Sequence, residues 1–348
     1  MKIVIIGSVA AGTSVAAKAR RNTEEAEIVV YDQDKDISYS ICGIPYYIGE
    51  EVEELDKLTP RNAAWFKKRY NVDIFTEHRV TAIHPETRTL EVENLQTKEK
   101  KTESYDELVL ATGAKPIVPE IFKAQQANRN LFRVRNIQDA AAIHSLIEKE
   151  KPQQATIIGA GFIGLEMAEQ LVHKGIEVTI IQRGNQVMKQ MDADMAYRVQ
   201  KELEKNHVKL QLNTTITKVM EKDGYITELA TNQEQTLKSD LVILAAGVTP
   251  NTSLIQSTTI QLGKSGAIKV NKKMQTTVPH IYAVGDVAES YSVITDKPIY
   301  RPLGSTANKM GRIAGDIITG GTLEHRGILG TGIVRVFDLA VAYTGLTE

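Results

Sequence analysis

The chain contains one short pattern twice, and this repeat constrains its fold more than any other feature. Residues 2–21, KIVIIGSVAAGTSVAAKARR, and residues 155–175, ATIIGAGFIGLEMAEQLVHKG, each pass from a β-branched strand through a glycine turn into an alanine-rich helix. Each then runs into a second strand, EIVVYD or EVTIIQR. The repeat therefore predicts an α/β protein with two nucleotide-binding units, each built on a doubly wound parallel sheet.

The glycine turn of the second unit, GAGFIG at residues 159–164, matches G-x-G-x-x-G between a strand and a helix. The first glycine permits the tight turn, the second lets a pyrophosphate approach the backbone, and the third allows close helix packing. The pattern is weak alone but specific in this context. It predicts a dinucleotide site.

The residues after the next strand bear on which dinucleotide binds there. A NAD site normally places Asp or Glu at this point to bind the ribose 2′-hydroxyl, whereas this chain has Gln182 and Arg183. Loss of the acid and gain of a cation favour a 2′-phosphate, and therefore NADPH over NADH. The alternative is that Arg183 faces solvent and does not contact the nucleotide.

The first unit has the turn GSVAAG at residues 7–12, with Val9 in place of the second glycine. Asp32 ends the following strand, 20 residues after Gly12, where a ribose partner belongs. Later, YAVGD at 282–286 places Asp286 after a strand and a glycine, which suits a polyol such as the ribityl chain of a flavin. A plain α/β turn without ligand is the alternative for the first motif.

Composition narrows the classes of partner. The 42 basic and 43 acidic residues give a formal net charge of −1, which provides no field for nucleic acid or anionic lipid. One cysteine among 348 residues fits a reducing compartment, and no apolar run approaches the ~18 residues of a membrane span. We expect a cytoplasmic protein with small-molecule partners. His84, His207 and His280 lack paired ligand spacing, so we expect no metal site.

Taken together, these motifs resemble the single-cysteine branch of the FAD- and NAD(P)H-dependent disulfide oxidoreductases, closest to coenzyme A disulfide reductase. The resemblance covers essentially the whole chain. Besides the two turns, it rests on the Cys42 segment SYSICGIPYYIG, ATGA at 111–114, AAGVTPN at 245–251 and ANKMGRIAGD at 307–316.

The resemblance implies two Rossmann-like domains in a glutathione-reductase-like arrangement. An FAD-binding domain would comprise residues 1–115 and 244–322, interrupted by an NAD(P)H-binding domain at 116–243. Residues 323–348 would begin a truncated dimerisation domain, and the full-length protein would be a homodimer. The expected cofactor contacts are Gly7, Val9, Ala10, Gly12, Asp32, Ala111, Thr112, Gly113, Gly159, Gly161, Phe162, Ile163, Gly164, Glu166, Gln182, Arg183, Gly247, Gly285, Asp286 and Ala307.

Cys42 is the expected catalytic residue. Paired-cysteine relatives carry C-x-x-x-x-C beside the flavin, but this chain has Ile37 and Tyr47 at that spacing from Cys42. The second sulfur or oxygen must therefore come from outside, so Cys42 would cycle through a mixed disulfide or a sulfenic acid. A helix start after Cys42 would lower its pKa.

The resemblance also bears on the acceptor. Oxidases and peroxidases of the branch carry a histidine in the first glycine turn, where this chain has Ala10, and they commonly lack its Pro45-Tyr46 pair. These features favour coenzyme A disulfide, a persulfide or a polysulfide, with Arg21 and Ser38 as substrate contacts. Ile41, where asparagine often precedes the cysteine, departs from the pattern. The alternatives are an NADH oxidase or peroxidase and, outside enzymology, a redox sensor or inactive fragment.

Overall fold

The computed structural model describes residues 1–347, which form two compact units. The first unit comprises residues 1–39, 59–115 and 249–330, and the second comprises residues 40–58, 116–248 and those from 331 onward. Each unit contains one of the two sequence repeats at the centre of a five-stranded parallel sheet. The predicted α/β fold with two Rossmann-like units is confirmed.

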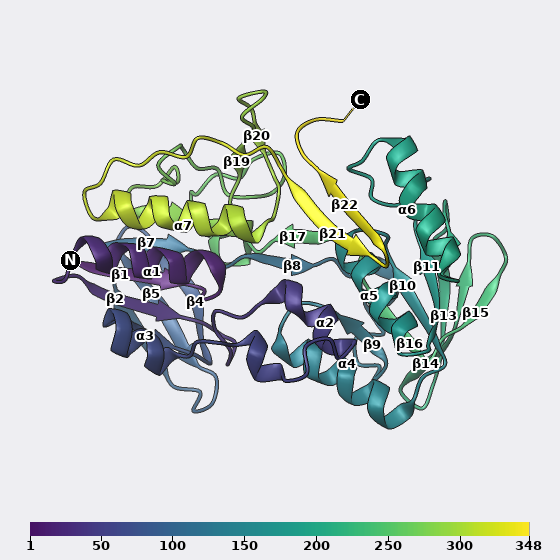
Figure 1. Cartoon of the computed structure of the whole chain (residues 1–348). Coiled ribbons are helices and arrows are strands. Elements are labelled where there is room, and N and C mark those ends of the chain that lie inside the picture. Colours follow the sequence, from purple (N-terminus) through teal and green to yellow (C-terminus); the bar gives the residue numbers. More distant parts are fainter. Residues whose placement is uncertain (348) are drawn as a thin grey trace. The chain divides into compact units, whose positions relative to one another are not determined.

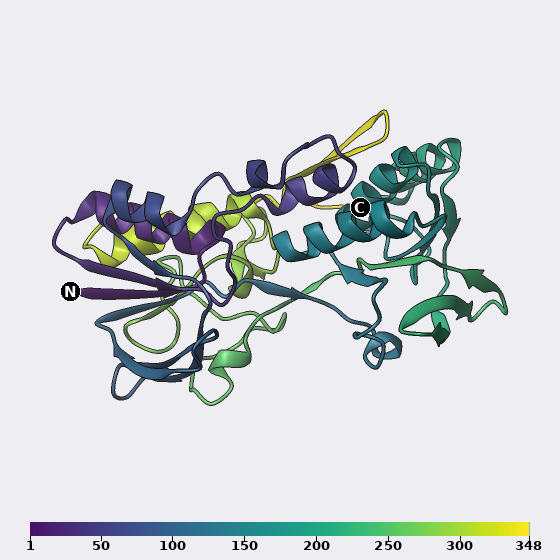
Figure 2. The ribbon, with the colours of Figure 1, turned by 90° about the horizontal axis from the view of Figure 1, so that it is seen from below.

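The parallel sheet of the first unit has the strand order β18-β7-β1-β2-β3. Helices α1 and α7 lie side by side on one face of it (Figure 1). The two helices can approach closely because Gly311 of α7 has no side chain. A Cβ at this position would lie 2.4 Å from the Ala11 carbonyl oxygen of α1. The antiparallel sheet β4-β5-β6 covers the opposite face (Figure 2).

The bounds in this unit are β1 Lys2–Ile6, α1 Ala10–Asn22, β2 Glu27–Tyr31, α3 Ala63–Tyr70, β3 Asp73–Phe75, β4 His78–His84, β5 Thr89–Asn94, β6 Lys100–Ser104, β7 Glu107–Leu110, β18 Ile281–Ala283, β19 Ser290–Tyr291, β20 Pro298–Ile299 and α7 Gly304–Ile318. Two short strands, β8 Ala114–Pro116 and β17 Val248–Pro250, stand where the chain passes between the units.

The second unit repeats this plan with the order β9-β16-β10-β11-β12. Strand β16, LVIL, is buried throughout, as its unbroken apolar sequence predicts, and the three middle residues of β10 are buried as well. An antiparallel sheet, β13-β14-β15, and a two-stranded hairpin, β21-β22, complete the unit. The hairpin contacts α5 and α6.

The bounds in this unit are α2 Ile44–Ile48, β9 Leu131–Arg133, α4 Ile137–Glu150, β10 Gln154–Ile158, α5 Phe162–His173, β11 Glu177–Ile181, α6 Ala193–Lys205, β12 Lys209–Gln211, β13 Ile216–Lys222, β14 Tyr225–Thr231, β15 Thr236–Lys238, β16 Leu241–Leu244, β21 Gly332–Val336 and β22 Leu339–Tyr343.

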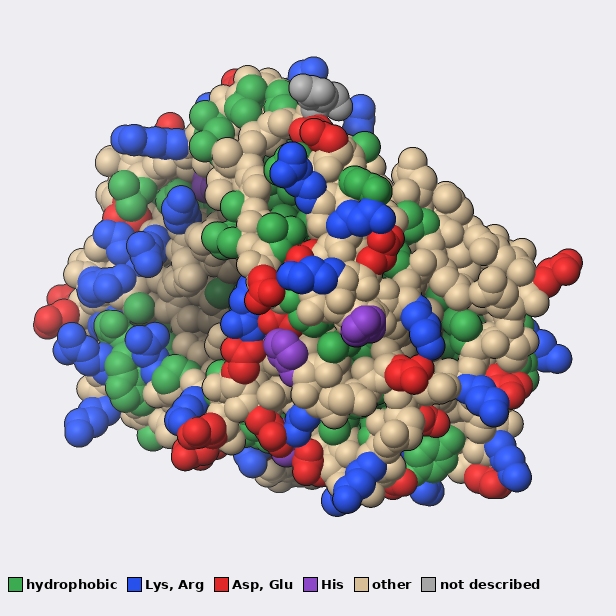
Figure 3. All heavy atoms as spheres, turned by 45° about the vertical axis from the view of Figure 1, so that its right-hand side comes forward, with side chains coloured by type: hydrophobic (Ala, Val, Ile, Leu, Met, Phe, Trp, Pro, Cys, Tyr) green, Lys and Arg blue, Asp and Glu red, His purple; other side chains and the backbone are tan. Residues whose placement is uncertain are grey.

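None of the helices within residues 1–347 is both long enough and apolar enough to traverse a bilayer. Acidic, basic and histidine side chains are intermingled in the middle of the face shown in Figure 3. This mixture agrees with the near-zero net charge.

Candidate functional site

In the first unit, four predicted motifs meet at one edge of the parallel sheet. Gly7 follows β1, Asp32 follows β2, the segment 111–113 follows β7, and the Gly285-Asp286 pair comes shortly after β18. Parallel strands place their carboxyl ends at the same edge, and ligands of doubly wound sheets bind there. The order of the strands therefore brings together residues that are almost 280 positions apart.

The two glycine turns have nearly the same geometry. Gly7 has φ +105° and Gly159 has φ +115°, a region that side chains strongly disfavour. A Cβ on either would lie 2.3 Å from a carbonyl oxygen, that of Ala111 in one unit and that of Ala245 in the other. The repeat seen in the sequence is thus a repeat of atomic contacts, and neither first glycine is replaceable.

Asp32 is tied to the first glycine turn. Its carboxylate accepts hydrogen bonds from the Ser8 amide at 2.7 Å, the Ser8 hydroxyl at 2.6 Å and the Asp34 amide at 2.9 Å. Burial raises the pKa of Asp32, although these bonds act in the opposite direction. The carboxylate is thereby fixed beside the turn, as a residue that binds ribose hydroxyls requires.

Gly285 and Ala307 pack against the start of α1. Gly285 has φ +75°, and a Cβ there would lie 2.9 Å from the Ala11 methyl and 3.4 Å from the Ala307 methyl. Asp286 lies in a short 3₁₀ turn, and its carbonyl accepts a bond from the Tyr300 hydroxyl at 3.0 Å. The predicted ribityl contact is therefore placed by close packing between α1 and α7.

In the second unit, space is open where a pyrophosphate would approach. A Cβ at Gly161 would meet nothing within 4 Å, whereas one at Gly164 would collide with the Gly159 carbonyl. The Gln182 side chain accepts a bond from the Ala160 amide at 3.2 Å and donates to the Gln186 carbonyl at 3.2 Å. Gln182 therefore lies on the glycine turn, while Arg183 beside it is exposed.

Phe162 and Glu166 both lie on α5, which begins at the second turn. The Phe162 ring stacks on Tyr343 of β22, with centroids 5.8 Å apart and planes 10° from parallel. Burial raises the pKa of Glu166 to about 7, and the neighbouring Glu169 carboxylate contributes to the rise. Ile163 is half-buried one position after Phe162, and Gly247 has φ +98° near the side chain of Ile117.

Cys42 lies in the second unit and is exposed. It occupies the 3₁₀ turn Ile41–Gly43, and α2 begins directly afterwards with Pro45 in its first turn. The expected helix start is therefore present, but the helix has only five residues. The predicted lowering of the Cys42 pKa stays a prediction.

Both predicted substrate contacts line one cavity of about 340 Å³ in the first unit. Arg21 comes from α1 and Ser38 from the loop after β2. Arg61, Arg312, Asn308, Trp65 and Tyr70 line the same cavity and were missed by the sequence analysis. The cation-and-aromatic run PRNAAWFKKRY at 60–70 was the signal that could have indicated Arg61, Trp65 and Tyr70, whereas Asn308 and Arg312 lie in the ANKMGRIAGD segment at 307–316.

This cavity has the chemistry of an anion site with an aromatic wall. Three arginine side chains enter it from α1, α7 and the segment before α3. Arg61 lies over the Trp65 ring at 5.0 Å from its centroid. Arginine forks fit phosphates bidentately, and an indole offers a flat face to a base. Val9 and Ala10, expected beside the cofactor, also line this cavity.

Comparison with known proteins identifies the family of this chain. The family model described as "Pyridine nucleotide-disulphide oxidoreductase" matches residues 1–308. The chain belongs to this family. Membership confirms the oxidoreductase class and the expected FAD and pyridine nucleotide cofactors, and the glycine turns and ribose-side carboxylates of this disulphide oxidoreductase fit them.

The names of individual relatives are more specific than the family description. A coenzyme A disulfide reductase of Staphylococcus aureus is 35% identical over 99% of this chain and 77% of its own length. The structure of reduced CoADR-RHD from Bacillus anthracis matches with 42% identity and a TM-score of 0.96, over 100% of this chain and 62% of that one. A NAD-dependent persulfide reductase from A. fulgidus matches with 35% identity and a TM-score of 0.95, and 64% of it is covered.

A water-forming NADH oxidase from Lactobacillus brevis is less similar. It is 30% identical, with a TM-score of 0.93 over 100% of this chain and 76% of its own. The oxidoreductase described here therefore spans under two thirds of the Bacillus anthracis and A. fulgidus chains and about three quarters of the other two.

Proposed function

We propose that this oxidoreductase uses NAD(P)H to reduce coenzyme A disulfide, a persulfide or a polysulfide through Cys42. The observation that carries the proposal is the cavity lined by Arg21, Arg61 and Arg312 with Trp65 beside them. Coenzyme A bears phosphate groups and an adenine ring, which are the groups that such a wall suits. The names of the relatives, coenzyme A disulfide reductase and persulfide reductase, support the same acceptor class.

The cofactors would bind at the carboxyl ends of the strands in the two parallel sheets. Asp32 and Asp286 would bind the two polyol ends of FAD in the first unit, and the Gly159 turn with Gln182 would hold the nicotinamide nucleotide in the second. When bound, the flavin passes two electrons from the nicotinamide nucleotide to a disulfide. The remaining chemistry belongs to the thiol of this chain.

The Cys42 thiolate would attack one sulfur of the acceptor disulfide, which breaks the S–S bond, forms a mixed disulfide and expels the first thiolate, and this thiolate takes up a proton from solvent. Two electrons and a proton then cleave the mixed disulfide, release the second thiol and regenerate the Cys42 thiolate. Overall, NAD(P)H, one proton and one disulfide give NAD(P)⁺ and two thiols. The exposure of Cys42 suits attack on an external disulfide.

We also propose that NADPH is used at least as well as NADH. Gln182 is held on the glycine turn, so no carboxylate stands at that position to repel a 2′-phosphate. Arg183 follows it and is exposed, within reach of solvent anions. The reducing cytoplasm is the proposed compartment because one thiol must stay available for turnover. The homodimer stays a prediction.

The second candidate is an NADH oxidase or peroxidase that uses Cys42 as a sulfenic acid. It is favoured by the likeness to the water-forming NADH oxidase, which is less similar to this chain than the two reductases. Against it stands Ala10 in the first turn, since an alanine offers no proton for splitting an O–O bond. The third candidate, a redox sensor or inactive fragment, predicts cofactor binding without turnover.

Turnover with a panel of acceptors separates these candidates. NADPH consumption should have a higher kcat/KM with coenzyme A disulfide or polysulfide than with oxygen or peroxide. Cys42→Ser should retain FAD and lose disulfide turnover, because serine forms no mixed disulfide. A higher kcat/KM with peroxide would establish the oxidase candidate, and bound FAD without turnover on any acceptor would establish the sensor. Disulfide turnover at the wild-type rate in Cys42→Ser would remove Cys42 from the mechanism.

A further inference from the structure

The segment that follows Cys42 is too short to hold its own conformation. Helix α2 has five residues, far fewer than an isolated helix needs in water. Gly49 follows its last residue, and a Cβ there would lie 1.8 Å from the Gln170 amide oxygen on α5. The turn after α2 therefore lies directly against α5, and two adjacent carboxylates, Glu50 and Glu51, leave it.

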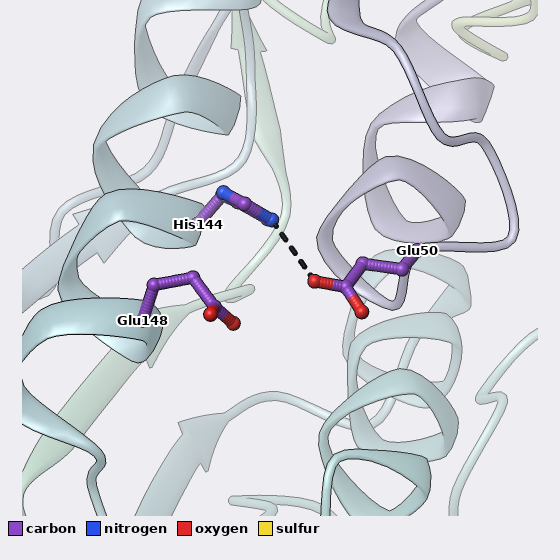
Figure 4. Close-up of side chains that lie close together, drawn as sticks. All are labelled: Glu50, His144 and Glu148. Atoms are coloured by element: carbon purple, nitrogen blue, oxygen red, sulfur yellow. Dashed lines mark hydrogen bonds and ion pairs between the residues drawn. The ribbon is translucent and has the colours of Figure 1, made fainter.

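Glu50 is bound by His144 of α4 and by Lys174 directly after α5. Its carboxylate lies 2.6 Å from the Lys174 ammonium and 3.3 Å from Nε2 of His144. Figure 4 shows Glu50 opposite His144 and Glu148, which lie on the same face of α4. Lys174 also contacts Glu148 at 3.1 Å, so its ammonium lies between the two carboxylates. The hydrogen bond from Lys174 lowers the pKa of Glu50.

A metal ion is not needed to explain this group of carboxylates and histidine. The three ligand atoms of Glu50, His144 and Glu148 lie within 4.8 Å of one another, but the Lys174 ammonium already supplies the cation. The arrangement is therefore an ion cluster that joins the turn after α2 to α4 and α5.

Glu51 is bound by different partners. Its carboxylate accepts a bond from the Gln170 amide at 2.9 Å and forms an ion pair with Arg335 of β21. The same guanidinium donates to Glu169 at 2.7 Å and lies 5.2 Å from the centre of the Tyr46 ring in α2. Arg335 thus contacts α2, the following turn and α5 together.

Glu169 makes this second cluster rigid. The residue is 1% exposed, and its other carboxylate oxygen accepts the Phe337 amide at 2.9 Å. A buried carboxylate strongly requires its cation, so Arg335 cannot easily leave. Glu51 is therefore bound to a fixed guanidinium, whereas Glu50, whose side chain is 52% exposed, is bound to Lys174 and His144.

We propose that Glu50 and Glu51 are positioning residues for Cys42. Each glutamate has its own set of partners, and together they hold the short segment that follows Cys42 against α5 of the second unit. The effect of this attachment on catalysis rests on the proposed disulfide reduction, whereas the attachment itself does not depend on it. A nucleophile must be held within a fraction of an ångström of its productive position, so a loosened segment would slow chemistry more than acceptor binding.

The test uses the FAD-loaded protein and the double variant Glu50→Gln, Glu51→Gln. Amide hydrogen exchange should become about tenfold faster in peptides that cover residues 41–52 and remain unchanged in the core strand β10. The kcat for disulfide should fall about tenfold while KM stays within about twofold. The matched control is Glu53→Gln, since the Glu53 side chain is 79% exposed and pairs only with Lys57 among the ion pairs of residues 1–347.

A charge-swapped variant tests the geometry. Glu50→Lys or Lys174→Glu alone places like charges together. The two changes combined restore the ion pair between positions 50 and 174, and should recover part of the lost kcat because a carboxylate at 174 still faces Glu148. Unchanged exchange over residues 41–52 in the double glutamine variant would overturn the attachment. Faster exchange with unchanged kcat would overturn the positioning role. If the wild-type protein reduces no disulfide, the proposed function fails, and the exchange measurement still decides whether the two glutamates fix the segment.

Discussion

Arg20 and Arg21 are neighbours in α1 with opposite roles. The Arg20 guanidinium donates to the backbone carbonyl of Tyr70, the last residue of α3, at 2.8 Å and to that of Ala26 in the loop after α1 at 2.7 Å. Arg21 lines the cavity instead. Successive helix residues point about 100° apart, so one arginine can bind α1 to the end of α3 while the next faces the ligand.

Arg21→Ala should therefore impair substrate binding rather than folding. Loss of one charge-assisted bond to a phosphate predicts about a tenfold higher KM for coenzyme A disulfide, with kcat changed less than about threefold. Steady-state kinetics measure both. Lys68→Ala is the control, because Lys68 is an exposed cation of α3 that does not line the cavity. An unchanged KM would show that Arg21 does not contact the acceptor.

Arg183→Glu should reverse the nucleotide preference. A carboxylate at this position repels a 2′-phosphate and can accept bonds from ribose hydroxyls, so the ratio of kcat/KM for NADPH to that for NADH should fall at least tenfold. Arg198→Glu makes the same charge change at an exposed position on α6 and should leave the ratio alone. Equal ratios in the two variants would mean that Arg183 faces solvent only.

Glu166 should make stability depend on pH. Its folded-state pKa of about 7 lies above the ordinary 4.5, so the folded protein binds more protons than the unfolded chain between these values. The contribution of Glu166 to the free energy of unfolding is highest below about pH 4.5 and decreases as the pH rises to about 7. Glu166→Gln removes the penalty, so its gain in Tm should be larger at pH 8 than at pH 5.

The exposed Glu150→Gln controls for the loss of one carboxylate from the same unit. Thermal scans of the FAD-loaded proteins at both pH values provide the measurement. A Tm difference for Glu166→Gln that is the same at pH 5 and pH 8 would contradict the raised pKa.

Arg335→Met should destabilise the second unit. It removes the cation beside the buried Glu169 carboxylate and leaves the bond from the Phe337 amide, which predicts a loss of about 2 to 3 kcal/mol. Denaturant unfolding measures this change. Adding Glu169→Gln should recover part of the loss because the buried charge is gone. A double variant that is less stable than the sum of the two single changes would contradict the pairing.

Sequence alone determined the features that depend on local chain geometry. Gly7 and Gly159 each lie in a turn where a side chain would meet a carbonyl oxygen. The glycine motif could therefore be recognised from the sequence at both places. Cys42 could also be singled out from the sequence, because it is the one cysteine in these 348 residues. Strand, turn and helix follow one another within about 20 residues, and side-chain types suffice to predict them.

Only the tertiary structure decided which distant side chains share a site. Arg21, Arg61 and Arg312 meet in one cavity although almost 300 residues separate the first from the last. Glu51 likewise lies beside Arg335 and Glu169 because α5 and β21 pack against the turn after α2. Single surface arginines and glutamates carry no periodic signal, since solvent accepts them in almost any position. Their roles arise when packing of the apolar core brings separate helices and strands together, and that arrangement depends on contacts between residues remote in sequence.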